Sequence, residues 1–150
     1  MTLLLNHTAP KFSELEKQMV KHIPPGGNWK DIPESVPSQR LAQIRRNGGG
    51  RTTYYGRLRW DKPSYTISTY FNRIGNGCFV HPEQDRLISI REGARLQSFL
   101  DSYEFAGSKG SIYKQIGNAV PPLLAYAIAT ALKKHTSKPD VIDLFCGAGG

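Results

Sequence analysis

The 150-residue sequence predicts an α/β protein that includes a small, loop-rich and mostly β subdomain. An apolar run over residues 141–145 leads into a glycine-rich turn, as a buried strand of a parallel sheet does. Ahead of it, an apolar helical pattern begins at Pro121 or Pro122 and continues to about Lys134. Residues 65–70 are rich in β-branched and aromatic side chains and predict small irregular sheet, while 15 glycines and 10 prolines indicate many loops.

The first elements along the chain are expected to be short. Ser13 and Glu16 have the spacing of a capping box, which predicts a helix over residues 13–22. Residues 23–33 combine prolines with paired glycines, which break both helices and strands, so we expect a loop there with Trp29 as its anchor. Residues 40–77 have the pattern of short strands and turns.

The second half of the sequence predicts two helices. Ser89 and Glu92 repeat the capping-box spacing, which predicts a helix of two to three turns that begins near Ile90 and continues through the apolar positions to Leu100. A further helix begins at Pro121 or Pro122, because a proline in the first turn has no amide hydrogen to lose.

The composition predicts a soluble globular protein of about one domain. Hydrophobic residues make up 39% of the chain, and no run of roughly 18 apolar residues is present to span a membrane. The first ten residues lack the pattern of a secretion signal. Cys78 and Cys146 lie far apart and without metal-ligand spacing. We therefore expect a cytoplasmic protein with no metal site and no membrane partner.

The net charge of +8 is concentrated in one stretch of the sequence. Residues 40–73 carry eight cations against the single acid Asp61, and aromatic residues and glycines are interspersed among them. The pattern suits phosphate neutralisation, although a solvated basic surface also explains it. The predominance of arginine over lysine favours recognition, because the planar guanidinium can grip phosphate or read guanine. The eight cations are Arg40, Arg45, Arg46, Arg51, Arg57, Arg59, Lys62 and Arg73.

Two glycine-containing motifs carry a resemblance to a known family. Residues 143–150, DLFCGAGG, resemble the S-adenosylmethionine loop of the cytosine-C5 DNA methyltransferases, and residues 117–122, GNAVPP, are similar to the segment that closes over the same cofactor. A plain structural turn is the alternative explanation for the first motif, and a helix cap or turn role is the alternative for Asn118. The resemblance implies cofactor contacts from Asn118, Ala119, Phe145, Gly147, Ala148 and Gly150.

Two further segments extend the resemblance. Residues 81–99 resemble the family's arginine-glutamate motif, which implies a structural role for Arg91 and Glu92. Residues 55–69 are similar to the end of a target-recognition domain of this family, which implies contacts to duplex DNA around a flipped cytosine. The residues expected to make these contacts are Arg57, Arg59, Thr66, Ser68, Thr69 and Arg73, with Arg40, Arg45, Arg46 and Arg51 as more general phosphate contacts.

The departures from the family pattern concern catalysis. The family's nucleophilic cysteine follows a proline, whereas Cys78 follows Gly77 and Cys146 follows Phe145. The family's glutamate-asparagine-valine and glutamine-arginine-arginine segments are also missing. The sequence therefore predicts target recognition and part of the cofactor site, but no catalytic residue.

The motif order is the reverse of the usual one, which predicts a circularly permuted or split enzyme, truncated after Gly150. We expect a fragment of an S-adenosylmethionine-dependent methyltransferase fold that belongs to a DNA (cytosine-5-)-methyltransferase, as in restriction-modification. The alternatives are a non-catalytic DNA-binding subunit that pairs with a catalytic chain, and an inactive remnant. The expected divisions are residues 1–39 (entry segment), 40–80 (target recognition), 81–135 (helical return) and 136–150 (first strand and cofactor loop).

Overall fold

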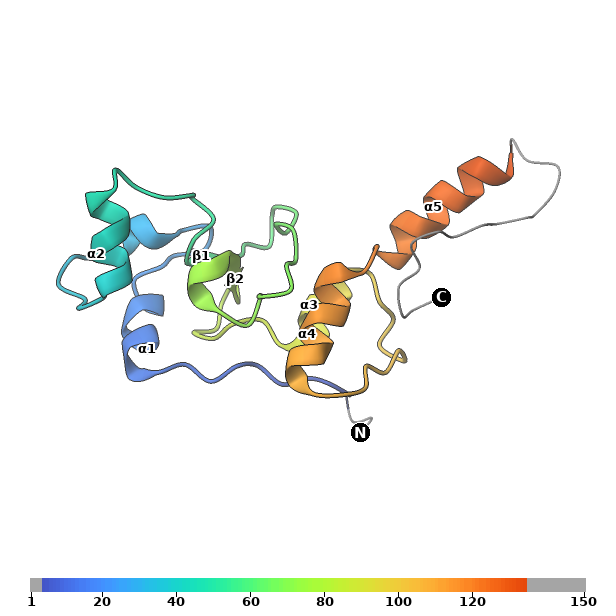
Figure 1. The fold of residues 1–150 in the computed structure, drawn as a ribbon, viewed down its shortest axis with the longest axis horizontal. Helices are drawn as coiled ribbons and strands as arrows, with labels where there is room; N and C mark the ends of the chain where they lie inside the picture. The colour runs from blue at the N-terminus through green and yellow to red at the C-terminus, as the bar shows by residue number, and fades with distance from the viewer. Residues whose placement is uncertain (1–3, 135–150) are drawn as a thin grey trace. The chain divides into compact units, whose positions relative to one another are not determined.

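A computed structural model of the chain describes residues 4–134, and Figure 1 shows their helices and strands. The chain divides into two compact units, Met1–Ala119 and Val120–Gly150. The described elements are, in order, α1 (Glu14–Val20), η1 (Trp29–Asp31), α2 (Gln39–Arg46), β1 (Gly56–Arg57), η2 (Ile74–Asn76), β2 (Cys78–Val80), α3 (Ile90–Leu96), α4 (Lys109–Asn118) and α5 (Pro122–Lys133).

Both predicted capping boxes are present. The Ser13 side chain accepts a hydrogen bond from the Glu16 amide, and the Glu16 carboxylate accepts one from the Ser13 amide at 2.8 Å. Ser89 and Glu92 make the same pair of bonds at the start of α3. Helix α3 is shorter than predicted, because it ends at Leu96 and the following residues turn away in a loop.

Helices α2 and α4 were not predicted from the sequence. Each begins with a serine N-cap, Ser38 and Ser108, whose side chain accepts from the amide three residues later. Helix α2 buries only Leu41, so it lacks the repeated apolar positions that indicate a helix. Its neighbour η1, a single 3-10 turn capped by Asn28, lies within the loop predicted over residues 23–33, and Trp29 is buried there as expected.

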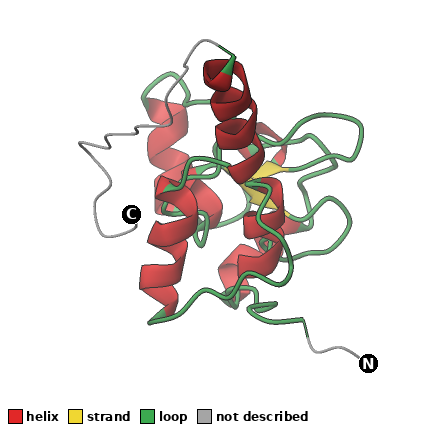
Figure 2. Ribbon diagram, turned by 90° about the vertical axis from the view of Figure 1, so that its right-hand side faces the viewer, coloured by secondary structure: helices red, strands yellow, loops and turns green. Residues whose placement is uncertain are grey.

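The β structure is smaller than predicted. Strands β1 and β2 pair in parallel with an irregularity between Gly56 and Arg57, and Val80 forms an antiparallel bridge to Leu87. The prediction of strand over residues 65–70 is wrong, because this segment is a loop whose Ile67 side chain enters the core while Tyr65, Thr66 and Tyr70 are exposed. Helices and loops dominate the described recognition region in place of the expected mostly β structure, and the strands in Figure 2 are short.

The core of the first unit joins residues that are distant in the sequence. Val20, Leu41, Phe71, Val80 and Ile116 are all fully buried and come from five different segments. With so few strand pairs available, much of the backbone in this unit must find its hydrogen-bond partners elsewhere.

Arg91 supplies partners for three backbone carbonyls from two segments, the amino-terminal segment and the loop after α3. Its side chain is fully buried and donates to the carbonyl oxygens of Leu5 (2.9 Å), Leu100 (3.0 Å) and Tyr103 (2.7 Å). Glu92 instead accepts from both terminal nitrogens of Arg86. Arg91 and Glu92 therefore serve the fold, as the sequence predicts.

The described part of the second unit is helix α5. It begins at Pro122 and ends at Lys133, as predicted from its proline start and apolar pattern. None of its residues is buried, and Leu124, Tyr126 and Ile128 are at least half exposed. No helix within residues 4–134 is both long and apolar enough to cross a membrane.

Candidate nucleic-acid interface and cofactor turn

The predicted DNA-contacting loop, residues 66–73, alternates between buried anchors and outward-facing residues. Ile67 and Phe71 lie in the core, with 3% and 0% of their surfaces exposed. Thr66 and Arg73, which flank the two anchors, are exposed, and Ser68 and Thr69, which lie between them, are half-buried. The structure thus brings four of the six predicted DNA contacts onto one short, anchored loop.

Polar contacts within the loop hold its exposed part in shape. The Ser68 hydroxyl accepts from the Tyr70 amide at 3.3 Å, and the Ser68 carbonyl accepts from the Phe71 amide at the same distance. The Arg73 guanidinium lies 5.7 Å from the centre of the Tyr70 ring, a cation–π arrangement. A cation fixed in this way can meet a phosphate with little loss of side-chain freedom.

Arg57 does not occupy a position from which it can contact DNA. Only 5% of its surface is exposed, and its side chain donates to the carbonyl oxygens of Val20, Ile23, His81 and Gln84 and to the Asp85 carboxylate. A guanidinium has five donor hydrogens, and these five acceptors match that number. The prediction for Arg57 therefore requires correction, because this arginine ties together backbone segments in the interior.

Arg59 lies two residues further on and is exposed. Its guanidinium makes a two-point ion pair with Asp61, with nitrogen–oxygen distances of 2.6 and 2.5 Å. The side-chain hydrogen bond between the two groups raises the pKa of Arg59 and lowers that of Asp61. An exposed pair of this kind exchanges partners readily, so Arg59 remains available to a phosphate.

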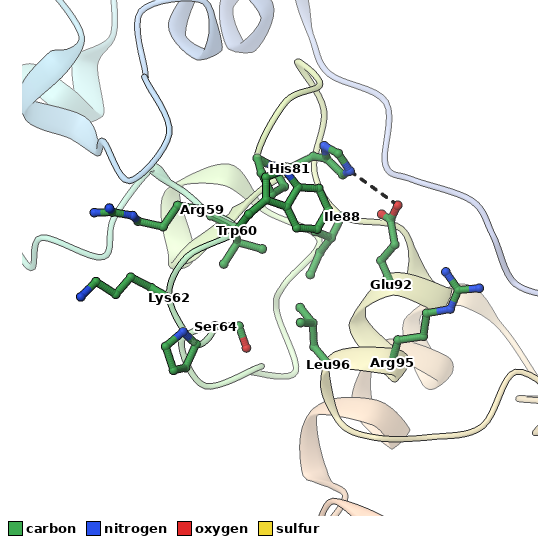
Figure 3. Close-up of a pocket in the computed structure, with 12 residues that line it drawn as sticks. Arg59, Trp60, Lys62, Ser64, His81, Ile88, Glu92, Arg95 and Leu96 are labelled. Carbon is green, nitrogen blue, oxygen red and sulfur yellow. Dashed lines mark ion pairs between the residues drawn. The ribbon is translucent and has the colours of Figure 1, made fainter.

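A pocket of about 470 Å³ lies between the loop that carries Arg59 and helix α3 (Figure 3). The Trp60 ring stands at its edge, 72% exposed, with its indole nitrogen donating to Glu83 at 2.8 Å. The ring meets His81 edge-on, with 6.0 Å between ring centres. His81 accepts two backbone amide bonds at Nδ1, and burial lowers its pKa, so the ring is neutral at pH 7.

The four general phosphate candidates are not equivalent in the structure. Arg40 donates to the Gly75 carbonyl and lies 5.9 Å from the ring centres of both Tyr54 and Tyr55. Arg45 donates to the Ile32 carbonyl. Arg46 and Arg51 are exposed, and neither makes an ion pair or a side-chain hydrogen bond within residues 4–134. The last two are thus the better placed for phosphate.

The two described residues predicted to contact the cofactor, Asn118 and Ala119, lie at the carboxyl end of α4 and are called the cofactor turn. Asn118, the last residue of the helix, is exposed, and its side-chain amide makes no hydrogen bond within the described part of the chain. It can therefore offer a donor and an acceptor to a ligand, which fits the contact that the resemblance implies. Gln97 from the end of α3 donates to the carbonyls of Ile116 (2.9 Å) and Ala119 (3.5 Å) and fixes the turn.

The remaining predicted cofactor contacts lie outside the described residues; they are Phe145, Gly147, Ala148 and Gly150.

The structure brings the predicted DNA-contacting loop, residues 66–73 (the recognition loop), into direct contact with the cofactor turn through Gly117. The sequence identified this glycine only as part of a motif. Gly117 lies so close to the loop that a Cβ atom built on it would be 2.4 Å from the Thr69 nitrogen. Only the absence of a side chain permits this approach. The signal in the sequence was the glycine itself, but no pattern identified its partner.

The chemistry available within residues 4–134 does not include a reactive thiol or a metal site. Burial raises the pKa of the Cys78 thiol to about 11, so it is protonated at neutral pH. No group of three His, Cys, Asp or Glu side chains in the described residues could hold a metal ion.

Comparison with known proteins identifies the family. The model of the C-5 cytosine-specific DNA methylase family matches residues 5–134. The chain belongs to this family. Proteins that resemble it include type II methylases and methyltransferases of bacteria and DNA (cytosine-5)-methyltransferases of plants.

Three relatives illustrate this range. The type II methylase M.HgiDII of Herpetosiphon aurantiacus is 41% identical over 134 residues, with 85% of this chain and 37% of the relative covered. The type II methyltransferase M.Sau96I of Staphylococcus aureus is 40% identical over 128 residues, with 85% and 29% covered. The DNA (cytosine-5)-methyltransferase 3 of Arabidopsis thaliana is 39% identical over 149 residues, with 89% and 10% covered. The chain thus spans well under half the length of these three relatives.

Proposed function

We propose that this chain supplies target recognition and part of the cofactor site to a DNA (cytosine-5-)-methyltransferase, which transfers a methyl group from S-adenosylmethionine to C5 of cytosine in duplex DNA. The observation that carries the proposal is the contact of Gly117 with the backbone of Ser68 and Thr69. It joins the DNA-facing loop to the turn that carries Asn118 and Ala119. The two substrates of such an enzyme would meet at this junction.

The DNA side of the proposal rests on Arg59, Thr66, Ser68, Thr69 and Arg73, together with the exposed Arg46 and Arg51. The hydroxyl and guanidinium groups on the anchored loop suit contacts to phosphate oxygens and base edges around a flipped cytosine. In this proposal Arg57 holds the neighbouring backbone in place and is not among the DNA contacts.

On the cofactor side, Asn118 and Ala119 would hold S-adenosylmethionine together with Phe145, Gly147, Ala148 and Gly150. When bound, the cofactor supplies the methyl group. Glycines let backbone amides approach a ligand that side chains would block. The family's model matches residues up to 134, and the glycine-rich segment follows that region, which supports a circularly permuted order of the motifs.

The chain supplies no nucleophile in this proposal. C5 of cytosine becomes reactive when a cysteine thiolate adds to C6 of the flipped base. Cys78 does not suit this role, because its thiol is buried in the core with a raised pKa. The thiolate would come from segments that complete the enzyme, either in a longer polypeptide or in a complementary catalytic chain.

The same observation about Cys78 favours a second candidate function, a non-catalytic DNA-binding specificity subunit of a split methyltransferase. Methyl transfer from radiolabelled S-adenosylmethionine to duplex DNA separates the possibilities. If the reading frame continues beyond Gly150 and encodes a proline-cysteine motif, the expressed single polypeptide should transfer the methyl group. A split enzyme is active only when the chain is mixed with its partner. Inactivity of both preparations would refute the proposal and leave an inactive remnant.

Binding of DNA by this chain is tested separately, by fluorescence anisotropy with labelled duplex over a range of salt concentrations. We expect affinity to fall steeply with salt, and Arg73→Ala to reduce the slope of log K against log salt by about one. Lys21→Ala, which removes an exposed cation next to α1, is the matched control and should leave the slope unchanged. Binding that does not depend on salt would contradict the DNA assignment.

A further inference from the structure

The contact between α4 and the recognition loop is closer than any side chain allows. A Cβ atom at Gly117 would lie 2.4 Å from the Thr69 nitrogen, 2.5 Å from the Ser68 carbonyl carbon and 2.6 Å from the Thr69 Cα. All three are backbone atoms, so they cannot move aside as the end of a flexible side chain can. A residue larger than glycine at this position must push the loop and the helix apart.

Aromatic packing also holds this loop against α4 and against α3. The Phe71 ring lies 4.5 Å from the Tyr113 ring of α4, in an edge-on arrangement. It also covers Gly93 of α3, where a Cβ atom would be 2.7 Å from the Phe71 ring. The loop is therefore seated on α3 and α4 through both its backbone and its buried anchor.

The part of α4 that contacts the recognition loop is continuous in the chain with the cofactor turn. Gly117 precedes Asn118 and Ala119, and Gln97 holds the carbonyl groups of Ile116 and Ala119 on either side. A displacement of the last turn of α4 must move the side chain of Asn118 with it. Within residues 4–134, the contact of Gly117 with Ser68 and Thr69 is therefore adjacent in the chain to the proposed cofactor contacts Asn118 and Ala119.

We propose that Gly117 is a positioning residue that holds the recognition loop and the cofactor turn in one preformed arrangement, so that each substrate finds its site ready before the other binds. This inference rests on the proposed function. The loop is held on α3 and α4 by protein contacts, the backbone approach at Gly117 and the buried Phe71 ring, so we expect the seated state not to depend on either substrate.

A substitution that unseats the loop should make the two substrates depend on each other. In Gly117→Ala the seated state becomes a minor one, and the apparent affinity for each ligand falls in proportion to its population. A seated fraction of about one tenth weakens S-adenosylmethionine binding about tenfold. Duplex DNA then reseats the loop and restores the affinity for the cofactor, because coupling between two ligands is reciprocal.

The experiment measures the dissociation constant of S-adenosylmethionine by isothermal titration calorimetry, with and without saturating cognate duplex, in the complete enzyme that contains this chain. Wild type should show less than a twofold effect of DNA. Gly117→Ala should bind the cofactor about tenfold more weakly without DNA and within about twofold of wild type with it. Gly110→Ala is the matched control in the same helix, because a Cβ atom there has its nearest contact at 4.0 Å, and it should behave as wild type.

Circular dichroism at the assay temperature must show that the variant is folded, because DNA could also rescue an unfolded protein by mass action. If Gly117→Ala does not fold, Gln97→Ala replaces it. That variant releases the cofactor turn from α3 without creating a clash, and the same loss and rescue are expected.

Two results would overturn the inference while leaving the proposed function intact. One is a folded Gly117→Ala enzyme with unchanged cofactor affinity, and the other is a loss of affinity that DNA does not relieve. A wild-type enzyme that binds neither substrate would instead refute the proposed function itself.

Discussion

Arg57 provides the sharpest test of the structure, because the sequence predicts a DNA contact and the structure places this residue in the interior. Truncation to alanine removes the donors for the carbonyl groups of Val20, Ile23 and His81. A buried acceptor left without a partner costs about 1–3 kcal/mol. The Asp85 carboxylate is half exposed and can be hydrated in the variant, so loss of its ion pair with Arg57 adds little. We expect Arg57→Ala to lower the free energy of unfolding by about 3–5 kcal/mol.

Urea-induced unfolding followed by far-ultraviolet circular dichroism measures this loss, and thermal unfolding should show a midpoint lower by about 6–20 °C. Arg57→Lys should also destabilise the protein, because an ammonium group has three donors in place of five. Arg59→Ala is the comparison: it should leave the unfolding curve close to wild type and weaken binding to duplex DNA. A structural role for Arg57 is contradicted if Arg57→Ala keeps wild-type stability and loses as much DNA affinity as Arg59→Ala.

Three further outcomes follow from the buried groups. Burial alone would raise the pKa of Glu92, but hydrogen bonds from Arg86 and Ser89 lower it from 4.5 to about 2. The stability it contributes is therefore present above pH 4.5 and lost as the pH falls toward 2, and Glu92→Gln should flatten acid unfolding curves in that window. Cys78 in the folded protein should resist iodoacetamide at pH 8, whereas urea should expose it to alkylation, as mass spectrometry of its peptide would show. Gly56→Ala should destabilise the protein in urea unfolding, because its Cβ atom would lie 2.8 Å from the Cys78 Cα, and equal stability would argue against the β1–β2 pairing.

Local signals in the sequence were sufficient for the elements that depend on near neighbours. The capping boxes at Ser13 and Ser89 and the proline start of α5 each involve residues within four positions, and the structure contains all three. Helix α2 escaped prediction because its one buried side chain, Leu41, leaves no periodic pattern.

Long-range packing decided the features that the sequence did not reveal. Residues 65–70 have strand-like composition, yet Ile67 and Phe71 enter the core and hold the segment as a loop. Likewise, Arg57 is indistinguishable in the sequence from its exposed neighbour Arg59. Its burial depends on carbonyl groups 24 to 37 residues away, which no local pattern reports.

The arginine contacts with distant backbone also constrain how the chain can fold during synthesis. Arg91 donates to the carbonyl of Leu5, 86 residues earlier, and the Phe105 amide donates to Asn6 across 99 residues. Ribosomes add roughly 5–20 residues per second, so the first residues wait about 5–20 seconds for their partners to be synthesised. During that interval the amino-terminal segment has polar backbone groups that only water or a chaperone can satisfy. These two contacts can form only after Arg91 and Phe105 have been synthesised, so the first unit closes as a whole at that point.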